Sequence, residues 1–212
     1  RQLVARHGCH HPGVALDKLV CRYADQNLAK ASLSDVVQVN ARLREDWQKD
    51  PEHWFRSLFA RRQQTIRGSQ QGVLPFRCQT TGPLTLHLAR SAALENAGIC
   101  LHPLYGFVYL PGTGLKGMAR AYAETVWFPA QFVTDAAGAP RDDVEKKKAI
   151  DAWRAIEDVF GWSPNSDDKK VWKPRCIPER HKREREHSGA IIFHDAWPID
   201  WPKLIVDILN NH

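Results

Sequence analysis

The sequence lacks any apolar run of the roughly 20 residues that a transmembrane helix requires, so we predict no membrane partner. No segment repeats internally. The first residues, RQLVARHGCHHPG, have no apolar core, and we therefore expect no secretory signal there. The chain starts without Met, and we expect further residues upstream. Together these features predict a cytoplasmic location.

Cysteine pairs at metal-ligand or disulfide spacing are also absent. The five cysteines are an odd number, lie far apart and include no C-x-x-C pair, which excludes a disulfide framework and fits a reducing compartment. The segment HGCHH, residues 7–11, could contribute zinc ligands. An exposed tail is the favoured interpretation, because paired ligand spacing is missing. We expect neither a metal ion nor a cofactor.

Positive charge is present in excess. The 30 Lys and Arg residues against 24 Asp and Glu give a formal net charge of +6, which predicts attraction to polyanions, nucleic acid being the commonest. A basic amphipathic membrane helix is less favoured, because the basic runs lack an apolar face. The densest basic run, residues 169–187, has few apolar residues, so we expect a mobile basic insertion at residues 165–188.

Helical periodicity dominates the first third of the chain. Apolar residues recur at helical spacing in residues 15–25, in residues 34–47, and again from Trp54. The last of these helices carries arginines on its remaining surface, at positions 56, 61, 62 and 67. They form either a solvated face or a contact to phosphate or to an acidic subunit. We predict an N-terminal helical segment at residues 1–75 and a second domain at residues 76–212.

Strand patterns appear in that second domain. LTLHLAR, residues 84–90, alternates apolar and polar positions, and strands are also predicted at residues 105–110 and 190–194. Apolar stripes predict one helix at residues 115–126, with Met118 and Tyr122 facing inward, and another at residues 142–160. We therefore expect an antiparallel sheet that contains residues 84–88 and 190–193, with the first of these helices packed on it.

The stretch VYLPGTGLKGMAR joins a predicted strand to a predicted helix through closely spaced glycines and Lys116. Glycines allow close approach of a ligand, and a helix start attracts anions, so the junction suits a phosphate or a phosphodiester. The nucleotide P-loop is excluded because Gly117, not Ser or Thr, follows the lysine. The G-x-G-x-x-G spacing also fails, which excludes a dinucleotide site. A tight structural turn is the alternative, and it would leave the lysine unexplained.

Three stretches in order resemble one protein family. LHPLYGFVYLPGTGLKGMARAYAE resembles the glycine-rich loop of RAMP proteins, which are subunits of CRISPR effector complexes. EDVFGWS and GAIIFHDAWP are similar to a turn and a strand of the same family. The order is most similar to the branch that forms the sixth subunit of the type III-B (Cmr) complex. The resemblance covers about residues 79–212. Thr113 and Gly114 depart from the usual Ser-Ser, and the chain stops before further expected strands.

The resemblance implies an α+β, ferredoxin-like fold related to the RNA-recognition motif, with an antiparallel sheet, helices on one face, and C-terminal strands missing here. It also implies a non-catalytic, RNA-binding structural subunit of an antiviral ribonucleoprotein, with guide RNA, target RNA and other Cmr subunits as partners. The residues then expected to bind RNA lie in and after the glycine-rich loop. They are Gly112, Thr113, Gly114, Lys116, Gly117 and Arg120.

A metal-independent endoribonuclease acting on CRISPR RNA or target RNA is the alternative function, since some RAMP relatives are nucleases. Such chemistry needs a general acid and base near a 2′-hydroxyl. The candidates are His87, His102, His194, Lys116 and Asp195. A lone histidine is more often structural, and alternation along a strand points adjacent residues 194 and 195 to opposite faces. We therefore expect no catalytic residue.

Overall fold

The computed structural model describes residues 10–16, 26–69, 72–86, 99–132, 143–162 and 187–206, with side chains from residue 33 onward in the second range. The chain forms two compact units. Unit 1 consists of Arg1–Tyr109 and Trp197–His212, and unit 2 is Leu110–Ala196. The boundary expected after residue 75 falls inside unit 1 and stays a prediction. Within the described ranges, no helix is long and apolar enough to cross a membrane.

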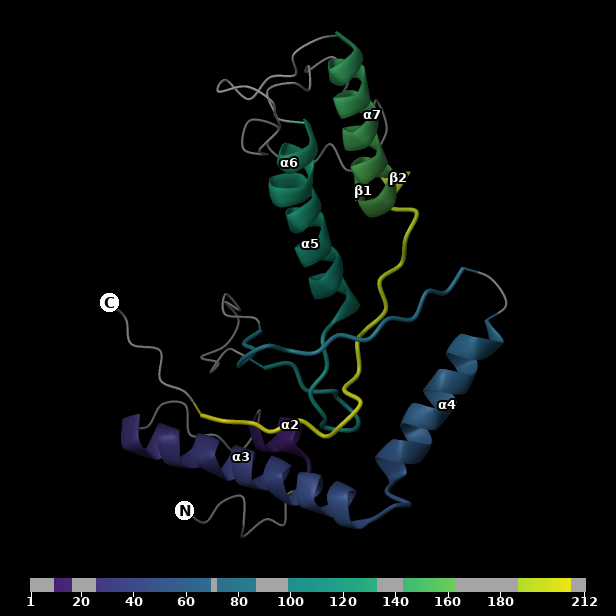
Figure 1. Ribbon diagram of the computed structural model, residues 1–212. Coiled ribbons are helices and arrows are strands. Elements are labelled where there is room, and N and C mark those ends of the chain that lie inside the picture. Colours follow the sequence, from purple (N-terminus) through teal and green to yellow (C-terminus); the bar gives the residue numbers. More distant parts are fainter. Residues whose placement is uncertain are drawn as a thin grey trace. The chain divides into compact units, whose positions relative to one another are not determined.

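The described residues of unit 1 include the helices α2 (Pro12–Val14), α3 (Gln26–Lys49) and α4 (Trp54–Gly68) (Figure 1). The helix predicted at residues 34–47 is confirmed within α3, which begins eight residues earlier (34 − 26 = 8). The chain bends sharply at the Asp50-Pro51 pair, since proline cannot continue the hydrogen-bond ladder of a helix. Most of the helix predicted at residues 15–25 lies outside the described residues.

Aromatic side chains form the core of unit 1. Phe55 from α4, Phe107 and Trp201 are each at most 1% exposed, and their rings meet edge to face at 5.0–6.4 Å. The Trp201 indole N–H donates to buried Asn40 Oδ1 at 2.9 Å, and the Asn40 amide donates to the Pro202 carbonyl at 3.0 Å. The late segment of the chain is therefore anchored on α3 by both apolar and polar contacts.

His53 is the N-cap of α4, immediately before the first helical residue, and it gives unit 1 a pH-sensitive hydrogen bond. Its side chain is buried, and its Nδ1 accepts a hydrogen bond from the Phe55 N–H at 3.3 Å. Burial lowers the pKa of His53 below its ordinary 6.5, and Arg56 contributes to this lowering. Asp50 and Asp46 act in the opposite direction without reversing it. The folded state therefore favours the neutral ring, which can serve as the cap acceptor.

The free energy of unfolding should consequently decrease on acidification. Because the folded pKa is the lower one, the contribution of His53 is complete above pH 6.5 and is lost as the pH falls through 6.5 towards the folded pKa. Urea unfolding at a series of pH values should show this loss. His53→Asn, which keeps a capping side chain but does not titrate, should make the curve shallower. Identical pH dependence in parent and variant would contradict the assignment.

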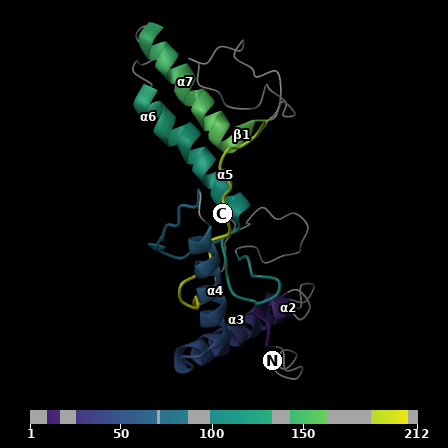
Figure 2. The ribbon, with the colours of Figure 1, turned by 90° about the vertical axis from the view of Figure 1, so that its right-hand side faces the viewer.

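Unit 2 is mainly helical, and its longer helices lie side by side (Figures 1 and 2). α5 (Gly112–Tyr122) runs into a π-helical turn, η2 (Ala123–Trp127), and then α6 (Phe128–Phe132). The cause of the wide turn is Pro129, because its ring would clash with the carbonyl four residues earlier in a regular helix. α7 (Asp143–Phe160) confirms the helix predicted at residues 142–160.

The core of unit 2 forms where α6 packs on α7. Phe128 and Ala149 are fully buried, Trp153 and Ile156 are 5% exposed, and the Phe128 and Trp153 rings meet edge to face at 5.2 Å. The predicted helix at residues 115–126 starts three residues early (115 − 112 = 3), at Gly112. The expectation that Met118 and Tyr122 face inward is wrong, since they are 65% and 60% exposed.

One small antiparallel sheet is present among the described residues, formed by β1 (Gly161–Trp162) and β2 (His187–Ser188). Isolated bridges join Leu101 to Val108 and Leu110 to Ala196, so the strand predicted at residues 105–110 is present only as single pairs. The mixture of helices and antiparallel pairing is compatible with the predicted α+β class. The ferredoxin-like arrangement stays a prediction.

The strand predicted at residues 190–194 is wrong. Its backbone is extended, but its first N–H groups donate to the end of α7, from Ala190 to Asp158 O at 2.8 Å and from Ile191 to Val159 O at 3.4 Å. The last carbonyls of a helix need such donors, and this demand outweighs strand pairing here. Of the strand predicted at residues 84–90, Leu84 is exposed, Leu86 forms an isolated β-bridge, and residues 87–90 lie outside the described residues.

Candidate nucleic-acid groove

The predicted glycine-rich loop is the first part of a helix. α5 begins at Gly112, so Gly114 and Gly117 also lie inside it, and Pro111 with φ −61° and ψ 136° is its N-cap. The glycines with positive φ in the described ranges are at other positions, which makes the loop conformation expected from the sequence wrong. Close approach, rather than left-handed backbone, must therefore explain the glycines of α5.

Gly112 is explained by contacts within the chain. A Cβ atom at this position would lie 2.0 Å from the Phe193 carbonyl oxygen, so only glycine fits against that backbone. The Gly112 N–H donates to Asp195 Oδ1 at 2.7 Å, and Leu110 pairs with Ala196 beside it. The segment at residues 193–196 thus packs directly on the start of α5. Gly112 is therefore required by packing within the chain, without any need for a ligand.

Gly114 and Gly117 have no such explanation. A Cβ atom added at either position would meet no atom within 4 Å among the described residues, and both residues are exposed. Glycine inside a helix costs about 1 kcal/mol relative to alanine. Residues three apart lie on one helix face, so the two glycines form a bare patch of backbone on α5. Such a patch permits close approach by a partner outside the chain.

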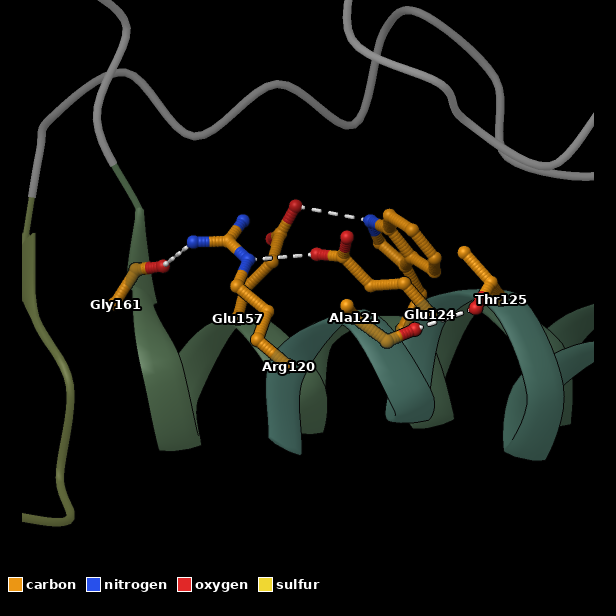
Figure 3. A network of polar contacts seen from close by, with 7 residues as sticks. Arg120, Ala121, Glu124, Thr125, Glu157 and Gly161 are labelled. Atoms are coloured by element: carbon orange, nitrogen blue, oxygen red, sulfur yellow. Dashed lines mark hydrogen bonds and ion pairs between the residues drawn. The ribbon is translucent and has the colours of Figure 1, made fainter. Parts of the chain in front are cut away.

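Lys116 and Arg120 lie one helical turn apart on α5. The Arg120 guanidinium is fixed by two contacts, from Nε to Glu124 Oε1 at 2.7 Å and from Nη1 to the Gly161 carbonyl at 3.2 Å (Figure 3). Lys116 forms no ion pair within the described residues. Arg120 is therefore a positioned cation that ties α5 to β1, whereas the ammonium of Lys116 can follow a ligand.

These residues border an open groove of about 520 Å³ in unit 2. Its lining comes from the start of α5, from the end of α7 with β1, and from β2 with the extended segment after it. Trp162 and His187, which are opposite each other in the β1–β2 pair, line it together with Lys116 and Arg120. The groove thus combines cations with aromatic surface, the combination that binds single-stranded nucleic acid.

Four of the six residues expected to bind RNA line this groove. They are Gly112, Thr113, Lys116 and Arg120. Gly114 and Gly117 lie on the same helix but outside the lining. Sequence reasoning missed Trp162 and His187, although each neighbours a backbone constraint: Gly161 has φ +86°, and a Cβ at Gly189 would lie 2.4 Å from the Val159 carbonyl oxygen.

The candidate acid–base residues do not share one unit. His102 belongs to unit 1, where its ring lies 4.8–5.7 Å from those of Tyr105, Phe107, Tyr109 and Trp197. His194, Asp195 and Lys116 belong to unit 2, where the Asp195 carboxylate accepts the Gly112 N–H. His87 lies outside the described residues. Residues 7–9 of the HGCHH segment and nearly all of the basic insertion at residues 165–188 also lie outside the described residues. His11 is described, and its Nδ1 accepts a hydrogen bond from the Val14 N–H at 3.2 Å.

No group of three or more metal-ligating side chains occurs in the part of the chain that the structure describes. Comparison with known proteins gives one match. A family model described as the RAMP superfamily matches residues 77–210, well over half of the chain, and this range includes α5, α7, both strands and the groove. No curated protein and no solved structure matches the chain.

Proposed function

The chain belongs to the RAMP superfamily, and from this premise we propose that it is a non-catalytic, RNA-binding subunit of a type III-B (Cmr) effector complex. A RAMP domain is a CRISPR-associated RNA-binding module that works with RNA and other subunits. The order of the three family-like stretches supports the position of the sixth Cmr subunit. The RNA bound is the guide or the target strand, and sister subunits occupy other surfaces.

The observation that carries this proposal is the groove, which Lys116 and Arg120 line together with the aromatic side chains of Trp162 and His187. Gly114 and Gly117 form a second, bare patch of backbone on another side of the same helix. The exposed glycines weaken the helix and serve no internal packing. Lys116 lies in the first turns of α5, where a positive charge opposes the positive end of the helix dipole. Both features are unfavourable for the isolated chain. A phosphodiester in the groove would offset the second of these, because negative charge is stabilised at the start of a helix and beside Lys116.

The non-catalytic role is supported by the placement of the acid–base candidates. General acid–base cleavage requires two such groups within hydrogen-bond reach of one ribose. The Asp195 carboxylate instead accepts a hydrogen bond from the start of α5, and the His102 ring lies among aromatic rings of unit 1. These contacts favour structural roles for both residues.

Lys116→Ala should weaken RNA binding while leaving folding almost unchanged. Losing one phosphate contact should cost about 1 kcal/mol of binding free energy and reduce the slope of log affinity against log salt by about 0.7, the value for one contact to a single strand. Filter-binding titrations with single-stranded RNA over a salt series measure both quantities. Lys147→Ala is the matched control, because it removes an exposed lysine from the early part of α7 in the same unit.

Two outcomes would contradict the proposal. If Lys116→Ala melts far below the parent and binds RNA normally, the lysine is structural and the groove does not hold the RNA backbone. The same mixtures should contain intact RNA on denaturing gels. Metal-independent cleavage that disappears in His194→Ala would favour the endoribonuclease instead.

A further inference from the structure

The exposed face of α4 is strongly and exclusively basic. The helix sequence WFRSLFARRQQTIRG contains arginines but no Asp or Glu. Arg56, Arg61 and Arg67 are all exposed, and the helical spacing of 100° per residue places them within one half of the helix surface. The first and last of them are separated by 11 residues, which is about 16 Å along the axis. The face is therefore a continuous positive surface in unit 1.

The arginines of α4 differ in how they are held. The Arg56 guanidinium lies 4.6 Å from the centre of the Trp47 ring and donates to the Trp47 carbonyl at 3.0 Å. Arg62, beside the exposed face, stacks on Trp197 at 4.0 Å. In the described ranges neither Arg61 nor Arg67 forms an ion pair. Two guanidinium groups are thus positioned by aromatic rings, and two others are exposed and have no counter-charge among the described residues.

The neighbouring helix α3 does not share this imbalance. α3 alternates signs, with Arg42 near Glu45 and Asp46, and its Lys49 ammonium lies 3.4 Å from Glu45 Oε2. A mixed pattern of this kind is typical of a face that only contacts solvent. Four like charges on one short helix instead repel one another. A bound polyanion would relieve that repulsion.

We propose that the exposed face of α4 binds the phosphate backbone of an RNA strand, as a second contact outside the matched residues 77–210. The inference rests on the proposed RNA-binding function. A row of guanidinium groups suits a linear polyanion, because each planar fork pairs with phosphate oxygens. Trp54 supports a nucleic-acid partner over an acidic protein. It is 40% exposed, stacks on Tyr105 at 5.5 Å, and lies two turns from Arg61 on the same face, where a base could stack on it.

The test uses the full chain and a labelled single-stranded RNA of mixed sequence. In the variant R61Q/R67Q, affinity at moderate salt should fall roughly tenfold, and the slope of log affinity against log salt should decrease by about 1.4, since each phosphate contact to a single strand contributes about 0.7. R61K/R67K keeps both charges and should retain the parental slope. The control R42Q/K49Q removes the same charge from α3 and should change affinity less than twofold.

The outcomes separate this proposal from the proposed function. If R61Q/R67Q behaves like R42Q/K49Q while Lys116→Ala still weakens binding, the α4 contact is wrong and the groove stands. If the parent chain does not bind RNA at all, both are wrong. If R61Q/R67Q binds RNA normally but loses an acidic protein partner that the parent retains, α4 is a protein-docking face and the proposal is overturned.

Discussion

Gly112→Ala should destabilise unit 2 by about 3 kcal/mol, the upper end of the usual range for an overpacked site. The added methyl group would lie 2.0 Å from the Phe193 carbonyl oxygen and 2.8 Å from its carbon. Both are backbone atoms, so no side-chain rotation relieves the clash. Moving the segment away would also break the 2.7 Å hydrogen bond from Gly112 to Asp195. Urea unfolding followed by circular dichroism measures the loss.

Gly114→Ala is the control on the same helix, and it should change stability in the opposite direction. Open space surrounds this position, so alanine should stabilise α5 by about 0.5–1 kcal/mol through its higher helix propensity. Equal stability of the two alanine variants would show that the close contact at Gly112 is not real.

Trp201→Ala should unfold much of unit 1, with a loss of about 3–5 kcal/mol, as for other fully buried aromatic residues. The side chain is 1% exposed and its ring contacts Phe55 at 5.5 Å. Its removal would also leave the Asn40 Oδ1 atom without the indole donor, now 2.9 Å away, inside the core. An unsatisfied buried acceptor adds to the cost of the cavity.

Thermal unfolding of Trp201→Ala and Trp201→Phe would separate the two contributions. Phenylalanine retains part of the ring packing but not the hydrogen bond, so its loss should be intermediate. Trp127→Ala is the control, because that tryptophan is 41% exposed and belongs to unit 2. A Trp201→Ala protein as stable as Trp127→Ala would contradict the assignment of the core.

The helices were the most predictable elements, because their signals are local. The apolar stripe ending at Phe160 and the break at Asp50-Pro51 depend only on neighbouring residues. The start of α5 was predicted too late because glycine has low helix propensity, and its three glycines suggested a loop. What stabilises that first turn is the carboxylate of Asp195, 83 residues away in sequence, and no local pattern reveals such a partner.

The segment after Gly189 was predicted as a strand, but no strand forms there. Its run of apolar residues matches a strand, but the Ala190 N–H is used by the Asp158 carbonyl at the end of α7. Only part of the groove lining could be predicted from the sequence, because its other residues also depend on contacts between distant parts of the chain. Lys116 and Arg120 lie within one motif, whereas Trp162 and His187 meet only through the pairing of β1 with β2. Contacts between distant residues therefore limited both the fold and the site.

The π-helical turn η2 has a consequence for the phase of the long helical segment that runs from Gly112 to Phe132. One such turn accommodates an extra residue, which rotates everything after it by about 100° relative to a regular helix. A helical wheel drawn from Lys116 through to Phe128 would therefore misplace the core residue. Deleting one residue within Ala123–Trp127 would remove the extra residue and give a regular helix, while leaving Phe128 directed at Trp153. The wide turn thus lies between the end of the helical segment that carries the groove cations Lys116 and Arg120 and the end that carries the core ring of Phe128.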